Sequence, residues 1–124
     1  MHVDEICAYC RSFPGACERF PFGPTALVFA VEGRMFALIS LGSVPPWVNL
    51  KCNPEWASAL REHYPAIRPG YHMNKRHWNT VVLDGTLPHS LIREMIRHSY
   101  ECVIAGLPRT LRECYRKELS QLQL

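Results

Sequence analysis

The sequence predicts an α+β protein in which helices pack on one face of an antiparallel five-stranded sheet. Three observations lead to this class. Several short runs are rich in β-branched and aromatic residues, which favour strands. The connections between these runs are mostly too short to hold the crossover helices that parallel strands need. Two longer segments repeat apolar residues with the 3.6-residue period of a helix that covers a sheet.

The N-terminal half is expected to form one helix and three consecutive strands. Residues 3–12 form a short amphipathic helix, which Pro14 and Gly15 end, and CERFPFGPT (17–25) is a loop punctuated by proline and glycine. Glu32-Gly33 then provides the turn of a hairpin. The predicted strands are TALVFAVE (25–32), RMFALISL (34–41) and WVNLK (47–51).

The C-terminal half is expected to add three helices and two more strands. Asn53 can cap a helix whose first residue is Pro54, and Pro65 ends it. Asp84-Gly85 closes a strand, and Gly106 and Pro108 end the longest helix. The predicted elements are a helix at 54–63, strands at 67–73 and 77–84, and helices at 88–105 and 109–120.

Length and composition suggest a single domain, residues 1–124, located in the cytoplasm. The N-terminus lacks the basic and apolar regions of a signal peptide, and the longest apolar run is broken by Gly42, Pro45 and Pro46. The net charge of +3 permits a nucleic-acid partner without requiring one. Between Arg61 and Arg76, however, basic residues outnumber acidic ones.

Six cysteines are expected to be reduced thiols, because nothing indicates secretion. Cys7 and Cys10 form a CxxC motif, but no second CxxC accompanies it, as a structural zinc site usually requires. On a helix the two thiols share an apolar face with Val3 and Ile6. They are therefore interpreted as buried small side chains, with redox or metal chemistry as the alternative.

The stretch GYHMNKRHWNTV (70–81) is the most chemically suggestive part of the chain. It places two histidines five residues apart, at His72 and His77. On a continuous strand these residues would face opposite ways and could not share an ion. Nearby cations also disfavour a divalent metal, so no metal site is predicted.

Catalysis is a second possibility for this stretch. Either histidine could act as a base, and Cys52 beside Lys51 could be an activated thiol. No GxSxG, GxGxxG or P-loop motif is present, and no complete set of catalytic partners is evident. A non-enzymatic protein without a cofactor is therefore the expectation.

Anion or nucleic-acid binding fits the residue types better. Lys75 and Arg76 can pair with phosphates, Asn74 can form hydrogen bonds, and Tyr71 and Trp78 offer faces for stacking. The simpler alternative is a solvated turn that leads into a strand, with Trp78 in the core. The patch could be enlarged by Arg34 and Arg68, if the fold brings them near.

Four collinear segments resemble the MmcQ/YjbR-like family: FPFGPTALVFAVEGRMFALISL, VNLKCNPE, YPAIRPGYHMNKRHWNTVVLDG and LIREMIRHSYECVIAGLP. The resemblance covers nearly the whole chain. The motif shared by that family stands here as Gly70–Trp78, and its VNLKC as Val48–Cys52. The resemblance implies a CyaY-like α+β fold and DNA binding, and it implies no catalytic residues. The family name also suggests an antibiotic-related setting, which favours a small-molecule ligand.

The main prediction is a DNA-binding protein of low sequence specificity and strong salt dependence. Its contacts would come from Lys51, Lys75, Arg34, Arg68, Arg76, Asn74, His72, His77, Tyr71 and Trp78. The alternative is a planar aromatic ligand in a pocket walled by Trp47, Trp78, Tyr71 and Phe22. A concave aromatic pocket would favour the ligand, and an open basic face would favour DNA. A third possibility is an interaction module that dimerises through an apolar sheet face.

Overall fold

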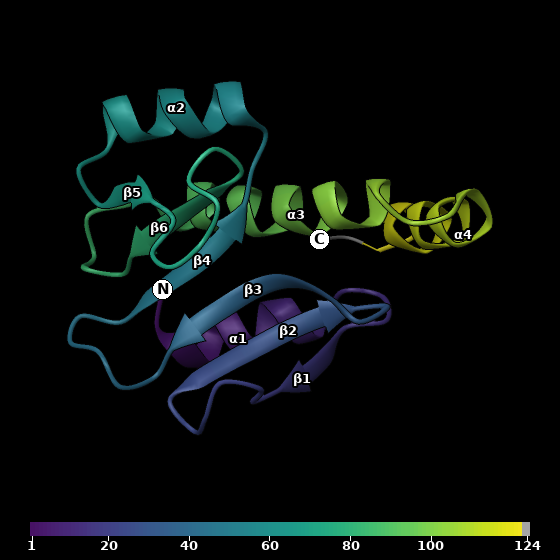
Figure 1. Cartoon of the computed structure of the whole chain (residues 1–124), viewed down its shortest axis with the longest axis horizontal. Helices are drawn as coiled ribbons and strands as arrows, with labels where there is room; N and C mark the ends of the chain where they lie inside the picture. Colours follow the sequence, from purple (N-terminus) through teal and green to yellow (C-terminus); the bar gives the residue numbers. More distant parts are fainter. Residues whose placement is uncertain (123–124) are drawn as a thin grey trace.

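A six-stranded antiparallel sheet organises the structure, a computed structural model that describes residues 1–122 (Figure 1). The predicted α+β class is confirmed, but the strand count of five is wrong. The strands follow the spatial order β1-β2-β3-β4-β6-β5. In chain order the elements are α1 (Val3–Arg11), β1 (Cys17–Arg19), β2 (Ala26–Val31), β3 (Arg34–Ser40), β4 (Trp47–Lys51), α2 (Pro54–His63), β5 (Ile67–Pro69), β6 (Trp78–Val82), α3 (His89–Ala105) and α4 (Arg109–Ser120).

The sixth strand is β1, in the segment that the sequence predicts to be a loop. It is three residues long and exposed throughout, so it has no alternation of apolar and polar residues that could indicate a strand. Its pairing with β2 alone defines it, with Cys17 opposite Ala30 and Arg19 opposite Val28. An edge strand that is short and charged protects the sheet against pairing with other chains.

The hairpin of β2 and β3 turns at the predicted residues, Glu32 and Gly33. Both have positive φ, 49° and 73°, as the tight turns of two-residue hairpins require. The pairing places Val28 opposite Leu38, with a register shift between Phe29 and Ala30. In the sheet, this hairpin lies between β1 and β4.

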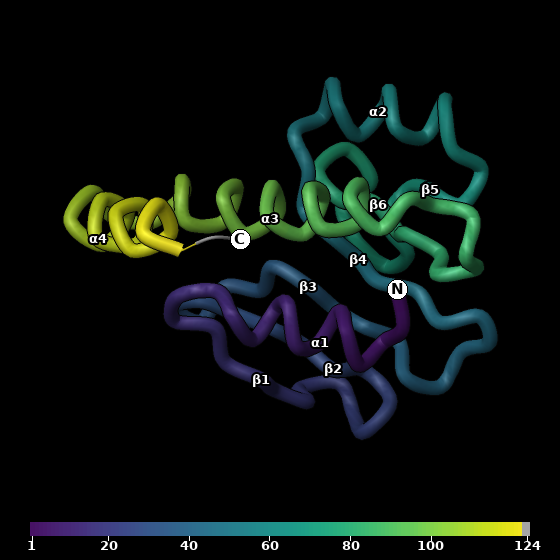
Figure 2. Tube along the Cα trace, turned by 180° about the vertical axis from the view of Figure 1, so that it is seen from behind, coloured from purple at the N-terminus to yellow at the C-terminus, as the bar shows by residue number. Residues whose placement is uncertain are grey.

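Helices α1, α2 and α3 cover one face of the sheet, and Figure 2 shows α1 and α3 in front of the strands. The main core lies between these layers and includes Ile6, Phe29, Phe36 and Ile96. The sheet and α3 are also joined by a buried hydroxyl. Ser99 Oγ donates to the carbonyl of Phe36 at 2.6 Å and accepts from the N–H of Lys51 at 2.8 Å.

Within residues 1–122, no helix covers the opposite face of the sheet, which is called here the open face. A smaller buried cluster lies on it, formed by Val28, Ala30 and Leu38. Leu38, Asn49, Thr80 and Arg68 stand opposite one another on β3, β4, β6 and β5. Residues opposite one another on adjacent strands share a face, so this row crosses the open face.

The predicted strand at 67–73 ends early, at Pro69. A proline cannot donate to the ladder, and His72 has a positive φ of 59°, so the chain turns away from β6. Residues 70–77 therefore form a loop, called here the signature loop, that returns to the sheet at Trp78. The early end of β5 therefore determines the geometry of the site.

The expected bounds of β4, α2 and α4 are confirmed, and the remaining boundaries differ from those expected by at most two residues, as is common at frayed ends. The predicted single domain, 1–124, includes two residues outside the part of the chain that is described here. Among residues 1–122, every helix is too short or too polar to cross a membrane.

Candidate ligand-binding groove

A groove of about 440 Å³ crosses the open face of the sheet. This volume lies within the range of known small-molecule sites, about 300–1,000 Å³. Its lining comes from both halves of the sheet and from two loops. The lining residues are Phe22, Thr25, Ala26, Leu38, Ser40, Trp47, Asn49, Tyr71, His72 and Met73.

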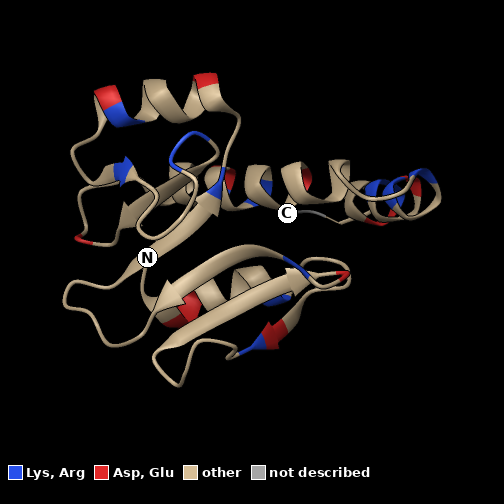
Figure 3. Cartoon of the chain, viewed as in Figure 1, with Lys and Arg blue, Asp and Glu red and all other residues tan. Residues whose placement is uncertain are grey.

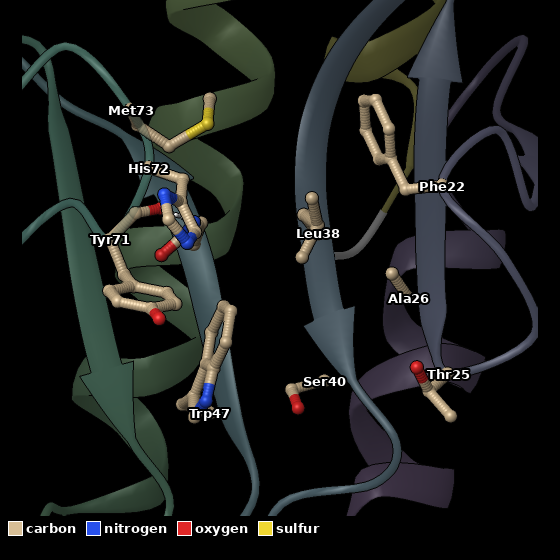
Figure 4. A pocket seen from close by; sticks show the side chains of 10 residues that line it. Phe22, Thr25, Ala26, Leu38, Ser40, Trp47, Tyr71, His72 and Met73 are labelled. Carbon is tan, nitrogen blue, oxygen red and sulfur yellow. Dashed lines mark hydrogen bonds between the residues drawn. The ribbon is translucent and has the colours of Figure 1, made fainter.

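Aromatic side chains stand on both walls of the groove (Figure 4). Tyr71 and His72 come from the signature loop and lie on the same side as Trp47 of β4. Phe22 faces them from the segment before β2, and Leu38 lies between the walls. Among residues 1–122, the lining includes no Lys, Arg, Asp or Glu, so the groove is a mainly apolar cleft with aromatic rings on two walls.

A closed set of hydrogen bonds fixes the backbone of Tyr71 to the floor of the groove. The Tyr71 N–H donates to Thr80 Oγ1 at 2.8 Å, and the Thr80 hydroxyl donates to Asn49 Oδ1 at 2.5 Å. Asn49 Nδ2 then donates to the Tyr71 carbonyl at 2.9 Å. Both Asn49 and Thr80 are buried, so these bonds are shielded from competition with water.

The same wall is shaped by contacts between its rings. Tyr71 lies edge-on to Trp47, with ring centroids 5.6 Å apart and an interplanar angle of 78°. The ring centroids of His72 and Tyr71 are 4.0 Å apart. His72 adopts its left-handed conformation in the middle of the turn, where a residue other than glycine is uncommon. The turn therefore places two consecutive rings beside Trp47.

The cations of the signature loop and of α2 serve largely to hold the loop closed. Lys75 Nζ donates to the Gly70 carbonyl at 3.0 Å, across the base of the loop. Arg61 Nη1 on α2 donates to the Lys75 carbonyl at 3.2 Å and to Asn79 Oδ1 at 2.7 Å. Asn74 Oδ1 accepts from the N–H groups of Arg76 and His77. Lys75 and Asn74 are therefore internal supports of this loop.

Gly70 is required at the base of the loop by close packing. A Cβ atom there would lie 2.8 Å from Trp78 Cβ and 2.9 Å from the Trp78 carbonyl oxygen. The Gly70 N–H also donates to that carbonyl at 2.9 Å. Trp78 itself is half-buried at the start of β6 and is not among the residues that line the groove.

The remaining predicted cations come from separate elements, and Figure 3 shows Lys and Arg positions spread over strands, helices and loops. Lys51 at the end of β4 and Arg68 on β5 belong to the β4-β6-β5 side of the sheet, and Arg76 lies on the signature loop that joins β5 to β6. Arg34 stands at the start of β3. Its Nη1 donates to the Gly106 carbonyl at 2.6 Å, so it stabilises the C-terminus of α3 instead.

Cys52 has no side-chain hydrogen bond to His72 or His77 among the described residues. Its backbone N–H donates to the His77 carbonyl at 2.8 Å. Its thiol is buried, and burial raises the pKa of Cys52 to about 12, which keeps the nucleophilic thiolate scarce at neutral pH.

A histidine that the sequence does not single out, His98, lies beside a thiol. His98 Nε2 accepts from the Asn53 N–H at 3.0 Å and lies 3.3 Å from Cys102 Sγ. The pKa of His98 is lowered and that of Cys102 is raised, in both cases mainly by burial. Both groups are therefore held in their neutral forms, which does not favour thiolate chemistry.

The CxxC cysteines, Cys7 and Cys10, are buried on the core side of α1 as free thiols. Burial raises the pKa of both. Within residues 1–122, no three His, Cys, Asp or Glu side chains are grouped so that they could hold a metal ion.

Several residues of the groove are missing from the sequence-based set, notably Asn49, Leu38 and Met73. Asn49 had a recognisable signal, because it is a polar residue in the middle of the apolar strand WVNLK. Leu38 and Met73 carried no such signal. Of the four residues expected to wall a pocket, Phe22, Trp47 and Tyr71 meet at the groove, and Trp78 does not.

Known proteins resemble this chain over part or nearly all of its length. The YjbR family model matches residues 11–102. The uncharacterized protein YjbR of Escherichia coli (strain K12) is 38% identical over 122 residues, which are 98% of this chain and 100% of that protein. The uncharacterized protein YyaQ of Bacillus subtilis (strain 168) is 45% identical over 53 residues, which are 43% of this chain and 44% of that protein.

Solved structures agree with the fold. A Deinococcus radiodurans protein with a DUF419 domain superposes with a TM-score of 0.86 at 40% identity, over 91% of this chain and 86% of that one. A Pseudomonas syringae protein superposes with a TM-score of 0.70 at 29% identity, over 80% of this chain and 96% of that one.

Proposed function

The chain belongs to the YjbR family, and we propose that it binds a small planar aromatic molecule in the groove on its open face. The observation that carries this proposal is the facing pair of aromatic walls, with Tyr71 and Trp47 on one side and Phe22 on the other (Figure 4). A flat ring system placed between them would contact aromatic faces and edges on both sides.

The signature loop supports this role through its internal bonding. Asn49 bonds the Tyr71 carbonyl and Lys75 bonds the Gly70 carbonyl, which holds the loop against the sheet. The loop thereby places Tyr71 and His72 in the lining of the groove. A wall fixed in advance costs little conformational entropy when a ligand binds. Under this proposal, the motif serves as the frame of a binding site.

A fluorescence titration with acridone, an uncharged three-ring planar compound, tests the proposal. The informative variant is Phe22→Ser, and the matched control is Phe20→Ser. Both phenylalanines are exposed and lie in the same segment, but only Phe22 lines the groove. Wild type should bind acridone, and loss of the Phe22 ring should weaken binding by about 3- to 10-fold.

The control should bind like wild type. Trp47→Leu should also weaken binding, whereas Trp56→Leu should not, because Trp56 lines a separate cleft between α2 and α3. The proposal is wrong if acridone does not bind, or if Phe20→Ser weakens binding as much as Phe22→Ser.

DNA binding is a second candidate, favoured by the presence of Lys51, Arg68 and Arg76 on neighbouring parts of the fold, namely β4, β5 and the loop that joins β5 to β6. These cations would contact phosphates, which carry no base sequence information, so binding would be salt-dependent and weakly specific. Lys75 contributes less than the sequence implies, because its ammonium group already donates to Gly70.

A salt-titrated binding assay on duplex DNA separates the two candidates. If DNA is the partner, Arg76→Ala and Arg68→Ala should each lower the affinity at about 50 mM salt. Each should also reduce the slope with which the affinity falls as salt is added. Arg109→Ala on α4 provides a control for the loss of one exposed cation elsewhere. The DNA candidate fails if none of the proteins binds, or if all three variants bind like wild type.

A further inference from the structure

A second, smaller hollow adjoins the groove on the open face. It measures about 220 Å³ and is lined by Trp47, Arg68, Pro69, Tyr71, Thr80 and Val82. The two hollows share Trp47 and Tyr71, whose edge-on ring pair therefore separates them. Among the described residues that line the two hollows, Arg68 is the only Lys, Arg, Asp or Glu.

We propose that the ligand of the groove carries an acidic group, which extends past the Trp47–Tyr71 pair and binds Arg68. This inference rests on the proposed function, because it assigns a second contact to the same ligand. The rings would lie in the mainly apolar groove, and the acid would lie in the neighbouring hollow, called here the Arg68 hollow.

Arg68 is suited to this role because most of the N–H donors of its guanidinium can bond a ligand. Within the described part of the chain, its guanidinium makes one hydrogen bond, from Nε to the Pro65 carbonyl at 3.5 Å. A guanidinium has five N–H donors and matches a carboxylate well. The exposed carboxylate of Asp84 accepts from the N–H and hydroxyl of Thr86, at 3.0 and 2.6 Å, and Arg68 acts on it only as a nearby charge that helps to lower the pKa of Asp84.

The spacing of the strands brings Arg68 within reach. Arg68 is paired with Thr80, and Thr80 with Asn49 on the groove floor. Two strand spacings separate the backbones of Arg68 and Asn49, about 10 Å. The long side chain of arginine can span part of that gap, so a ligand arm of a few atoms would complete it.

Three related compounds test the inference: acridone, acridone with a carboxypropyl arm on its ring nitrogen, and the primary amide of that acid. The amide controls for the size of the arm. Wild type should bind the acid about two- to fivefold more tightly than the amide, which is the range of an exposed ion pair.

The preference for the acid should disappear in Arg68→Gln and persist in the control Arg34→Gln, since Arg34 lies away from both hollows. Equal affinity for the amide in wild type and Arg68→Gln would show that the groove is intact. The inference is overturned if wild type does not prefer the acid, or if Arg68→Gln keeps the preference.

This failure is distinguishable from failure of the proposed function. If acridone and the amide bind but the acid has no advantage, the groove stands and the Arg68 contact is wrong. If none of the three compounds binds wild type, both proposals are overturned.

Discussion

Asn49 Nδ2 donates a 2.9 Å hydrogen bond to the carbonyl of Tyr71, which ties the middle of β4 to the wall of the groove. Asn49 is only 1% exposed, and its other amide atom accepts from Thr80. A buried amide that is fully paired fixes its neighbours firmly, and an unpaired one is costly. The bond therefore links stability to the shape of the groove.

Replacing Asn49 with leucine should lower both stability and ligand affinity. The change leaves the Tyr71 carbonyl without its donor and the Thr80 hydroxyl without its acceptor, which should cost about 1–3 kcal/mol in the free energy of unfolding. Urea denaturation measures the first effect, and acridone titration measures the second.

Asn53→Ala is the matched control for this change. Asn53 caps α2 through Oδ1, away from the groove, so its loss should cost about 0.5–2 kcal/mol of stability. Acridone affinity should be unchanged in this control. A similar loss of affinity in both variants would show that general destabilisation, rather than the Tyr71 wall, controls binding.

Arg34→Met should destabilise the protein without changing its affinity for acridone or for DNA. Arg34 bonds the Gly106 carbonyl at the C-terminus of α3, an exposed contact that should contribute about 0.5–1 kcal/mol. Thermal or urea unfolding would detect the change. An effect of this variant on acridone or DNA binding would contradict the place that the structure gives to Arg34.

His98 should make stability depend on pH on the acid side of neutrality. Burial lowers its pKa in the folded state, and the neutral ring accepts from the Asn53 N–H. The unfolded chain therefore binds a proton first as pH falls. The resulting stability is present above the ordinary histidine pKa of about 6.5 and is lost as pH falls through the lower folded value.

Urea denaturation at about pH 7.5 and pH 5.5 would measure this loss. His98→Gln removes the titrating group, so its stability should fall less between the two pH values than that of wild type. An identical fall in both proteins would mean that His98 does not contribute to this dependence.

The six thiols should differ sharply in their reaction with iodoacetamide at about pH 8. Cys17 and Cys114 are exposed and should be alkylated in the folded protein. Cys52 is buried with a pKa of about 12, so it should react only after unfolding. Peptide mass spectrometry would identify the labelled sites. Fast labelling of Cys52 in the folded protein would instead support an activated thiol.

The sequence predicts the fold well where elements are long and periodic. The stripe of α3, the Asn53-Pro54 start of α2 and the Glu32-Gly33 turn are all local signals, and the structure agrees with them. The strand β1 has no such signal, because pairing with β2 is its sole definition. The CyaY-like arrangement implied by the family resemblance stays a prediction.

The site is less predictable, because it depends on which distant segments meet. Phe22, Trp47 and Tyr71 can be proposed together from residue type, and they line one groove. The roles of Lys75 and Arg61 could not be predicted, because sequence does not show that a cation bonds a backbone carbonyl. A cationic motif can therefore look like a phosphate-binding site in sequence, although its Lys75 side chain and the nearby Arg61 bond backbone carbonyls of the signature loop.

The most direct test of the groove is a map of backbone amide chemical shifts in labelled protein as acridone is added. The proposed site predicts that the largest changes fall on residues such as Ala26, Leu38, Tyr71 and His72. Changes that centre on Arg76 and Lys51, or on the cleft around Trp56, would contradict the account, as would the absence of any change.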